Sequence, residues 1–214
     1  MTTHAAWWPL ADLRIITPDL TLRPLAEADL GPLAARLPAD VEFDPALPTY
    51  GGADPAVARG TGLHQTYWRA LGNWRIESWD LLLAVVFDDE VIGVQSLEGS
   101  DFAHRRTVET WSFLLSAARG RGFGKSMRRA VLSLAFDHLG ALAAETEALA
   151  GNGPSLGVSR ALGYLPNGET FHPHADALEV MVRMRLTRER CRSLGRTADV
   201  DVAGLEACRH LFGV

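Results

Sequence analysis

A glycine-rich segment, Arg119–Lys125, constrains the fold of this sequence more than any other stretch. It follows an apolar run over Thr107–Leu115 that predicts a β-strand, and it precedes an amphipathic stretch whose buried face includes Met127, Val131 and Leu134. A turn between a strand and a helix directs several backbone N–H groups to the helix N-terminus, where they can bind phosphate. The segment therefore predicts a phosphate or pyrophosphate site, and the alternative is a tight turn that binds nothing.

Two common phosphate-binding motifs do not fit this turn. The ATP-type loop G-x-x-x-x-G-K-[ST] needs a glycine where the chain has Arg119, although the final GKS of that loop is present. The dinucleotide fingerprint G-x-G-x-x-G fails because Gly120-x-Gly122 is followed by Lys125 where the third glycine belongs. The sequence therefore favours neither ATP nor NAD as the ligand.

Apolar periodicity divides the rest of the chain into strands and helices, with strands in the majority. The expected strands are Leu13–Ile16, Leu20–Leu25, Leu81–Phe87, Val91–Leu97, Leu142–Leu149 and Leu178–Leu186, and the expected helices are Ala26–Leu37, Ala56–Trp79, Ser155–Leu162 and Thr187–Arg196. Gly72 is a point at which the second of these helices can break. A loop over Val41–Ala53, rich in proline and glycine, is expected to shape a substrate mouth.

The composition is that of one ordinary globular domain. The 214 residues are 47% hydrophobic and 22% charged, which is enough to bury one core and gives no sign of disorder. The formal net charge of −5 disfavours nucleic-acid binding through bulk electrostatics, because the neutralisation of phosphates needs a basic face. Lys125 is the sole lysine, so arginine supplies the other positive side chains.

The cellular setting is also constrained by composition. The first residues lack the basic and apolar regions of a signal peptide, and no apolar run approaches the length of a membrane span, so a cytoplasmic location without membrane contact is expected. Cys191 and Cys208 are the only cysteines, and they provide neither a disulfide framework nor a zinc spacing. We expect two reduced thiols and no metal site.

Two separate segments resemble one known family. Arg119–Gly124 reads as [QR]-x-x-G-x-[GA] after a strand, which resembles the acyl-CoA signature of the GCN5-related N-acetyltransferases (GNAT). One helix and one strand later, Asn152–Tyr164 is similar to that family's N-x-x-[SA]-x-x-[LV]-x-x-x-x-G-[FY] motif. Helix capping explains Asn152 and Gly163 singly, but it does not explain the order and spacing of both segments.

The resemblance, over roughly Leu20–Leu186, implies an α/β (α+β) fold. Its central sheet is mixed and mostly antiparallel, with six to seven strands flanked by helices. The strands over 107–115 and 142–149 splay apart in this fold. Residues 1–186 are expected to form the acyltransferase domain, with 187–214 as a C-terminal appendage packed on it. A homodimer or higher homo-oligomer is compatible with the apolar tail.

The same resemblance places an acyl-CoA co-substrate. The implied contacts are Phe113, Leu114 and Leu115 with the pantetheine arm, Arg119, Gly120, Arg121, Gly122, Phe123, Gly124, Lys125 and Ser126 with the pyrophosphate, and Asn152 and Ser155 in the second motif. Arg128 and Arg129 are further candidates for the phosphate oxygens, and a solvated helix face is the alternative for both.

Family catalysis implies a base and a group near the sulfur. Glu109 matches the carboxylate of the family's E-[IL]-G-Y-W-L strand and would act through water, whereas the alternative is a surface carboxylate paired with Arg105 or Arg106. Ser155 matches the serine of the ribosomal-protein N-terminal acetyltransferase type, or it caps a helix. Ser159 stands where many members have a tyrosine acid, and a serine hydroxyl is a far weaker acid.

The implied activity is direct transfer of an acyl group from acyl-CoA to a primary amine, on a protein N-terminus, a lysine or a small molecule. Acetyl-CoA is one donor. Succinyl-CoA is the other, because Trp8–Leu10 with Asp12–Arg14, and Cys208–Gly213, resemble segments of a bacterial subgroup that includes succinyltransferases. A succinyl carboxylate would need a cation such as Arg69, Arg75 or His104. The alternatives are an aminoacyl-tRNA-dependent transferase on the same fold and a non-catalytic CoA-binding module.

The place of three tryptophans is left open by the sequence. Trp68, Trp74 and Trp79 either line the acceptor pocket or belong to the core.

Overall fold

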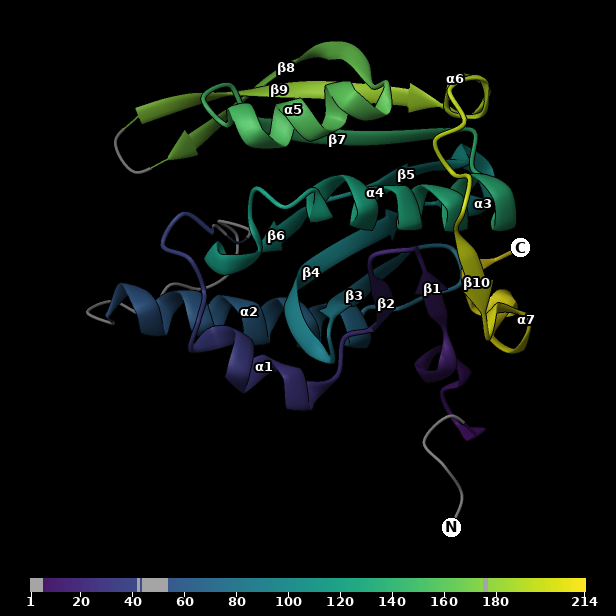
Figure 1. Ribbon diagram of the computed structural model, residues 1–214, viewed down its shortest axis with the longest axis horizontal. Coiled ribbons are helices and arrows are strands. Elements are labelled where there is room, and N and C mark those ends of the chain that lie inside the picture. Colours follow the sequence, from purple (N-terminus) through teal and green to yellow (C-terminus); the bar gives the residue numbers. More distant parts are fainter. Residues whose placement is uncertain (1–5, 42, 44–53, 175–176) are drawn as a thin grey trace.

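The structure, a computed structural model, describes residues 6–41, 43, 54–174 and 177–214 (Figure 1). The strands are β1 (Arg14–Ile16), β2 (Thr21–Pro24), β3 (Trp79–Phe87), β4 (Glu90–Gly99), β5 (Thr107–Glu109), β6 (Ser112–Leu114), β7 (Ala143–Leu149), β8 (Leu165–His174), β9 (Ala177–Thr187) and β10 (Asp201–Ala203). The helices are α1 (Glu27–Ala34), α2 (Pro55–Gly72), α3 (Phe102–Arg105), α4 (Phe123–Ser133), α5 (Gly153–Leu162), α6 (Arg188–Ser193) and α7 (Leu205–Cys208). Short 3₁₀ segments cover Pro9–Asp12, Ser116–Ala118 and Arg209–Phe212, and a π-helical turn covers Leu134–His138.

The ten described strands form one sheet in the order β10-β1-β2-β3-β4-β5-β7-β9-β8, with β6 also paired to β4. Only the β5–β7 pair is parallel, so the expected mixed and mostly antiparallel sheet is confirmed. The number of strands exceeds the expected six to seven for three reasons. The 107–115 strand is divided in two, β8 has a polar, proline-containing sequence without apolar alternation, and β10 has only three residues.

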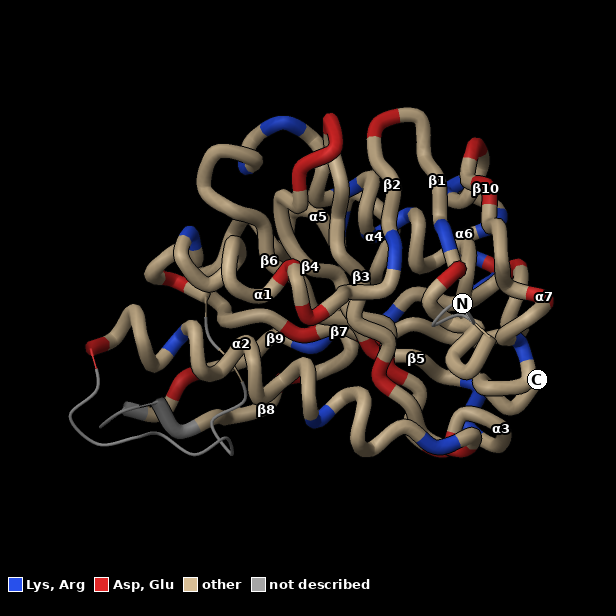
Figure 2. The backbone as a smooth tube through the Cα atoms, turned by 90° about the horizontal axis from the view of Figure 1, so that it is seen from below, with Lys and Arg blue, Asp and Glu red and all other residues tan. Residues whose placement is uncertain are grey.

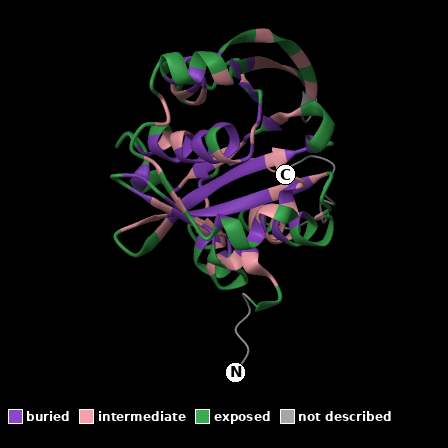
Figure 3. Cartoon of the chain, turned by 90° about the vertical axis from the view of Figure 1, so that its right-hand side faces the viewer, coloured by how far each residue is buried: buried purple, intermediate pink, exposed green. Residues whose placement is uncertain are grey.

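Helices cover both faces of this sheet, and each face has its own core. On one face, α4 and α5 pack over strand residues such as Leu83 and Ala144. On the opposite face, α1 and α2 pack over residues such as Leu82 and Phe113. Figure 3 shows the central strands buried between these layers. The alternation of Leu82 and Leu83 between the two cores is the period of two that an extended strand imposes.

Helix α2 is shorter than the sequence predicted. It begins at Pro55, where the Asp54 side chain accepts a hydrogen bond from the Ala56 N–H at 2.7 Å, and it ends at Gly72. The expected extension to Trp79 is wrong, because Trp79 begins β3 and stacks with Trp74 at a ring-centroid distance of 6.1 Å. Trp74 and Trp79 belong to one aromatic cluster beyond the end of the helix, together with Phe212.

The C-terminal segment is part of the sheet and of the core. Strand β10 pairs with β1, and Phe212 is fully buried with its ring centroid 4.9 Å from that of Trp79. From α4, the Arg129 guanidinium donates to the carbonyls of Arg196 and Ala198 at 3.0 and 2.6 Å. Within the described ranges, no helix has the length and apolar character needed to cross a membrane.

Candidate active site

A fork opens in the middle of the sheet between β6 and β7. Strand β5 pairs with β7, and the Thr110 N–H still donates to the Glu145 carbonyl at 3.1 Å. Beyond that point β6 continues along β4, whereas β7 continues along β9. The Thr146 hydroxyl donates to the Thr110 carbonyl at 3.0 Å and closes the fork at its base. The two strands that were expected to splay therefore do so.

The division of the 107–115 strand has a local cause. Its two halves keep one register against β4, with Glu109 opposite Glu98 and Ser112 opposite Gln95. Between them, the Trp111 N–H donates to the Ser96 hydroxyl at 2.9 Å. A side-chain acceptor thus interrupts the regular ladder of main-chain hydrogen bonds at the level of the fork.

Among the three residues expected to meet pantetheine, Leu114 is the one whose main chain faces the fork. The Leu115 N–H donates to the Ile92 carbonyl at 2.9 Å, so Leu115 and Phe113 direct their main-chain groups toward β4. The groups of Leu114 point the opposite way, because backbone groups alternate sides along a strand. The Leu114 carbonyl accepts a hydrogen bond from Arg119 Nε at 3.1 Å.

The N-termini of α4 and α5 both lie beyond the open end of the fork. Strands β6 and β7 run in the same direction, and each is followed by its helix at its C-terminal end (Figure 1). Gly122 is the N-cap of α4 and makes no side-chain capping hydrogen bond, while Asn152 caps α5 through its side-chain oxygen, which accepts from the Ser155 N–H at 3.1 Å. Among the described residues, the start of α4 therefore has no side-chain cap at the open end of the fork, whereas α5 does.

The glycines of the turn have different structural reasons. Gly120 and Gly122 have φ angles of +75° and +90°, a region that other residues rarely adopt. Gly124 lies inside α4, and an added Cβ there would come within 3.2 Å of a Val158 methyl group in α5. The first two glycines shape the turn, and the third allows two helices to pack closely.

The basic residues of the turn are held in three different ways. Arg119 makes a bidentate ion pair with Asp40 at 2.8 and 3.0 Å, which lowers the pKa of that carboxyl group. The Arg121 guanidinium lies 4.7 Å from the ring centroids of both Phe87 and Phe123, as a cation–π contact. Lys125 is exposed and forms no ion pair within the described part of the chain.

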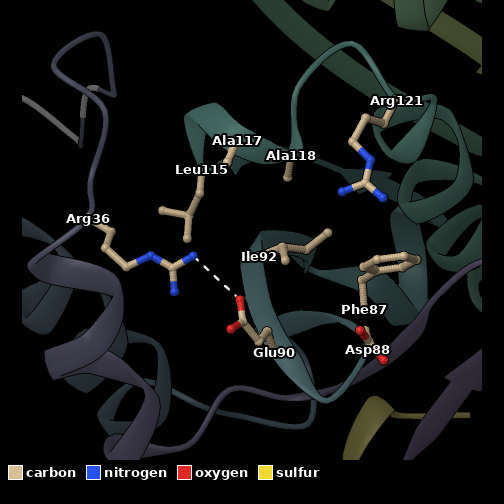
Figure 4. A pocket seen from close by; sticks show the side chains of 9 residues that line it. All are labelled: Arg36, Phe87, Asp88, Glu90, Ile92, Leu115, Ala117, Ala118 and Arg121. Carbon is tan, nitrogen blue, oxygen red and sulfur yellow. Dashed lines mark ion pairs between the residues drawn. The ribbon is translucent and has the colours of Figure 1, made fainter.

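A small hollow of about 320 Å³ lies beside the turn, between it and the β3–β4 hairpin (Figure 4). Arg121 points into it from the turn, and Arg36 faces Glu90 across its other side at 3.7 Å. Because the lining also includes Asp88, the hollow carries charges of both signs. It is therefore not a purely basic site of the kind that favours phosphate.

Three further residues of α4 expected near the phosphates lie elsewhere. Ser126 is buried, and its hydroxyl donates to Asp19 at 3.0 Å. Arg128 is buried beneath the helix, close to Tyr164, and Arg129 binds the C-terminal segment. Each position faces protein rather than the open turn. The expectation that Arg128 and Arg129 bind phosphate oxygens is wrong.

Helix α5 separates the two candidate serines. The Ser159 side chain is buried, and its hydroxyl donates to the Ser155 carbonyl one turn earlier at 3.3 Å. Ser155 is half-buried near the start of the helix, and its side chain has no hydrogen-bond partner among the described residues. Ser155 is therefore the serine with a free hydroxyl near the open end of the fork.

Glu109 belongs to a row of carboxylates that crosses four strands on the face covered by α2. Asp80 of β3 lies opposite Glu98 of β4, Glu98 lies opposite Glu109 of β5, and Glu109 lies beside Glu145 of β7. Partners in register direct their side chains to the same face. Figure 2 shows the acidic segments of these strands from that side.

The members of this row have different electrostatic environments. Burial raises the pKa of Asp80 well above its ordinary value, and the neighbouring Glu98 raises it further. Burial and the charge of Glu109 likewise raise the pKa of Glu98, while Arg69 of α2 lowers both values. Glu145 is neutralised by Arg183 and Arg185, each at 2.9 Å. Glu109 itself is exposed.

The sequence did not identify Asp80, Glu98 and Glu145 as candidates. Each stands in or beside an apolar strand, where a carboxylate is rare unless it is paired or functional. A charged residue within an apolar strand was therefore the signal that could have identified them. What brings them together is the register of four strands that are distant in sequence. Arg105 and Arg106, the expected partners of Glu109, make no ion pair with it in the described structure.

The other expected acceptor residues are dispersed. Trp68 is exposed, Trp79 is buried in the core, and Trp74 lines a separate cavity. His104 pairs with Asp101 at 2.7 Å on the surface, away from the fork. The Val41–Ala53 loop falls almost wholly outside the described residues.

Comparison with known proteins adds a decisive observation to this geometry. The sequence model of the acetyltransferase (GNAT) domain matches residues 19–165, which include the turn, the fork and α5. The chain belongs to the GNAT acetyltransferase family. The resemblance drawn from the two motifs is thus confirmed, and the chain is an acyl-CoA-dependent N-acyltransferase.

Solved GNAT structures share this fold. RimJ of Mycobacterium smegmatis in complex with CoA-disulfide has a TM-score of 0.69 over 88% of this chain and 97% of that chain, at 18% identity. The spermidine N-acetyltransferase of Vibrio cholerae, in complex with CoA and spermine, has a TM-score of 0.61 over 81% of this chain and 98% of that chain, at 16% identity. At these identities the likeness concerns the fold alone.

Proposed function

We propose that this GNAT protein transfers an acetyl group from acetyl-CoA to a primary amine by direct attack of the amine on the thioester. The observation that carries the proposal is the fork, with the uncapped N-terminus of α4 at its open end and Glu109 beside its base. An extended ligand fits this arrangement if its anionic part binds the helix N-terminus and its reacting carbonyl reaches the base of the fork.

The donor would be bound mainly by main-chain groups. The N–H groups at the start of α4 would hold the pyrophosphate, and Lys125 is placed to add a positive charge. The main-chain N–H of Leu114, which faces the fork, would bind a pantetheine carbonyl as an additional strand does, whereas the Leu114 carbonyl is already bound by Arg119. Arg119 would act indirectly, by fixing the turn to Asp40 and to the Leu114 carbonyl.

The transfer itself needs few protein groups. A neutral amine forms the new C–N bond, the C–S bond breaks, and the sulfur leaves as a thiolate. Glu109 would take the amine proton through water, because it is the exposed carboxylate nearest the base of the fork. The free hydroxyl of Ser155 would donate a hydrogen bond to the thiolate, whereas Ser159 is committed to a helix carbonyl.

The carboxylate row supports acetyl over succinyl as the acyl group. A succinyl carboxylate at the base of the fork would face Glu98 and Glu109, and like charges repel, while Arg69 of α2 offsets only part of this negative charge. The arginines of the neighbouring β9 are paired with Glu145. The same row attracts a cationic acceptor, such as a small-molecule amine or the N-terminus of a protein.

The test is to measure acyl transfer from acetyl-CoA and from succinyl-CoA to a panel of amines, together with the binding of each thioester by calorimetry. We expect micromolar binding of acetyl-CoA and turnover with at least one cationic amine. Turnover with succinyl-CoA alone would overturn the choice of donor. Saturable CoA binding without turnover on any amine or peptide would identify a non-catalytic CoA-binding module instead.

A further inference from the structure

A second cavity, of about 680 Å³, lies outside the fork, over β2 and β3. It is partly open, and it is bordered by the N-terminal 3₁₀ segment, the C-terminal half of α2 and the connection from β2 to α1. Its volume is within the range of small-molecule sites, which hold a ligand largely removed from water. Its described lining includes neither Glu109 nor Ser155 nor the glycine turn, the residues to which the proposed transfer is assigned.

Aromatic and aliphatic side chains form most of the wall. Trp8 and Trp74 meet edge to face with a ring-centroid distance of 5.6 Å, and α2 contributes Tyr67 and Leu71 to the wall. The Trp74 indole N–H donates to the Leu211 carbonyl at 3.0 Å, so its polar atom is satisfied by the C-terminal segment. What the cavity offers is therefore the apolar surface of these rings.

The two arginines at this cavity are already engaged. Arg14 donates to the carbonyls of Ala11 and Leu13, both at 2.8 Å. Arg23 is bound by Asp29 in a bidentate pair at 2.7 and 2.8 Å. Neither guanidinium is available to bind an anionic ligand without the loss of these contacts.

Asp80, one of the residues that line the cavity, has one carboxylate oxygen without a hydrogen bond in the described structure. Its Oδ1 is fully buried and has no hydrogen-bond partner among the described residues. Glu98 lies opposite it in β4 and adds negative charge, while Arg69 of α2 offsets that charge in part. A buried carboxylate oxygen without a donor is costly, and a ligand that brings a positive charge removes that cost.

We propose that this cavity is a binding site for an organic cation with an apolar body, with the body against Trp8 and Trp74 and the charged head at Asp80. The site is distinct from the transfer centre, because Asp80 and Glu109 are separated by β4, which corresponds to about 10 Å across two strand spacings. Glu27 at the rim adds a further negative charge that favours entry of a cation.

Binding should be linked to proton release. The raised pKa values of Asp80 and Glu98 mean that the pair holds a proton more tightly than free carboxyl groups do. A cation at Asp80 favours the ionised form, so any proton that the pair holds is released on binding. The other charges around the pair are Arg69, Arg14, Arg23, Glu27 and Glu109.

The test uses benzyltrimethylammonium, which carries an aromatic body and a permanent charge and has no N–H that could be acylated. Calorimetry of the full chain is expected to show saturable binding whose heat differs between two buffers of different ionisation enthalpy. Asp80→Asn and the cavity-filling Ala11→Phe are each expected to weaken binding at least tenfold. Glu109→Gln is the matched control from the fork and should change the affinity less than twofold.

Two further probes separate the contributions of head and body. Tetramethylammonium has the charge without the ring, and benzyl alcohol has the ring without the charge, so both should bind at least tenfold more weakly. Undiminished binding to Asp80→Asn, or a loss of binding in Glu109→Gln, would overturn the proposal. Acetyl-CoA affinity measured on the same samples reports folding and the transfer site independently, so failure here is distinguishable from failure of the proposed function.

Discussion

Glu98 of β4 lies directly opposite Glu109 of β5, and the two side chains share the face of the sheet covered by α2. Glu98 accepts a hydrogen bond from the Ser96 hydroxyl at 3.2 Å, while burial and the charge of Glu109 raise its pKa. One carboxyl group of the pair is thus sheltered and the other is exposed beside the fork. When two neighbouring carboxyl groups have different environments, one can hold a proton while the other stays ionised and accepts one.

We expect Glu109→Gln to lower kcat by about 10²- to 10⁴-fold, the usual contribution of a general base, without a change in acetyl-CoA affinity. Glu98→Gln is the matched control on the neighbouring strand and should retain most of the activity at neutral pH. Steady-state kinetics with a calorimetric measurement of acetyl-CoA binding checks both. A larger loss with Glu98→Gln than with Glu109→Gln would place the base on β4.

We expect Asp80→Asn to be more stable than the parent protein at neutral pH and to lose that advantage as the pH falls. The folded-state pKa of Asp80 lies above its unfolded value, so the folded protein binds the proton more tightly. Its stability therefore decreases as the pH rises through that range, whereas asparagine does not titrate. Urea unfolding of both proteins at several pH values gives the difference. An equal difference at acidic and neutral pH would contradict this assignment.

We expect Gly122→Glu to weaken acetyl-CoA binding more than tenfold, because a carboxylate at the start of α4 opposes the pyrophosphate. Gly122→Asn is the matched control, since asparagine tolerates the left-handed backbone better than most residues and adds no charge. Gly124 is a poor test position because its Cβ would crowd Val158. Calorimetry on folded samples, verified by circular dichroism, decides the outcome. Equal affinities of the two Gly122 variants would argue against a phosphate at this turn.

We expect Ser155→Ala to lower kcat about tenfold and Ser159→Ala to change it less than twofold. Ser155 has a free hydroxyl, whereas the Ser159 hydroxyl is bound to a carbonyl inside α5. Both substitutions preserve helix propensity, so the comparison isolates the hydroxyl group. Initial rates at saturating acetyl-CoA provide the measurement. The reverse order would assign the sulfur-binding role to Ser159.

We expect both cysteines to resist alkylation in the folded protein at pH 8. Cys191 and Cys208 are buried, and burial raises the pKa of each thiol to about 11. The thiolate fraction is then about a hundredfold below that of an ordinary thiol, and access is restricted as well. Mass spectrometry after iodoacetamide treatment, with and without urea, checks the prediction. Rapid labelling without urea would show that the C-terminal segment opens readily.

Features contained in one continuous segment could be predicted from the sequence. The Arg119–Gly124 turn needs glycine at its positive φ angles, and Asn152 caps the helix that follows it, so the fold family could be predicted from these residues. The same reasoning carried α2 on to Trp79, because Trp68, Leu71 and Trp74 keep helical spacing, although it marked Gly72, where α2 ends, as a possible break. It also missed β8, whose pairing comes from β9 rather than from its own polar sequence.

The sequence by itself determined the family, the glycine turn and the place of Glu109 and Ser155 within their motifs, because each rests on residues close together in the chain. Only the tertiary structure decided that Glu109 stands in a row with Asp80 and Glu98, or that Trp8 and Trp74 enclose a cavity over Asp80. The physical reason is register: a slip of one residue in β3 or β4 would turn these carboxylates to the other face, and no local signal fixes that pairing.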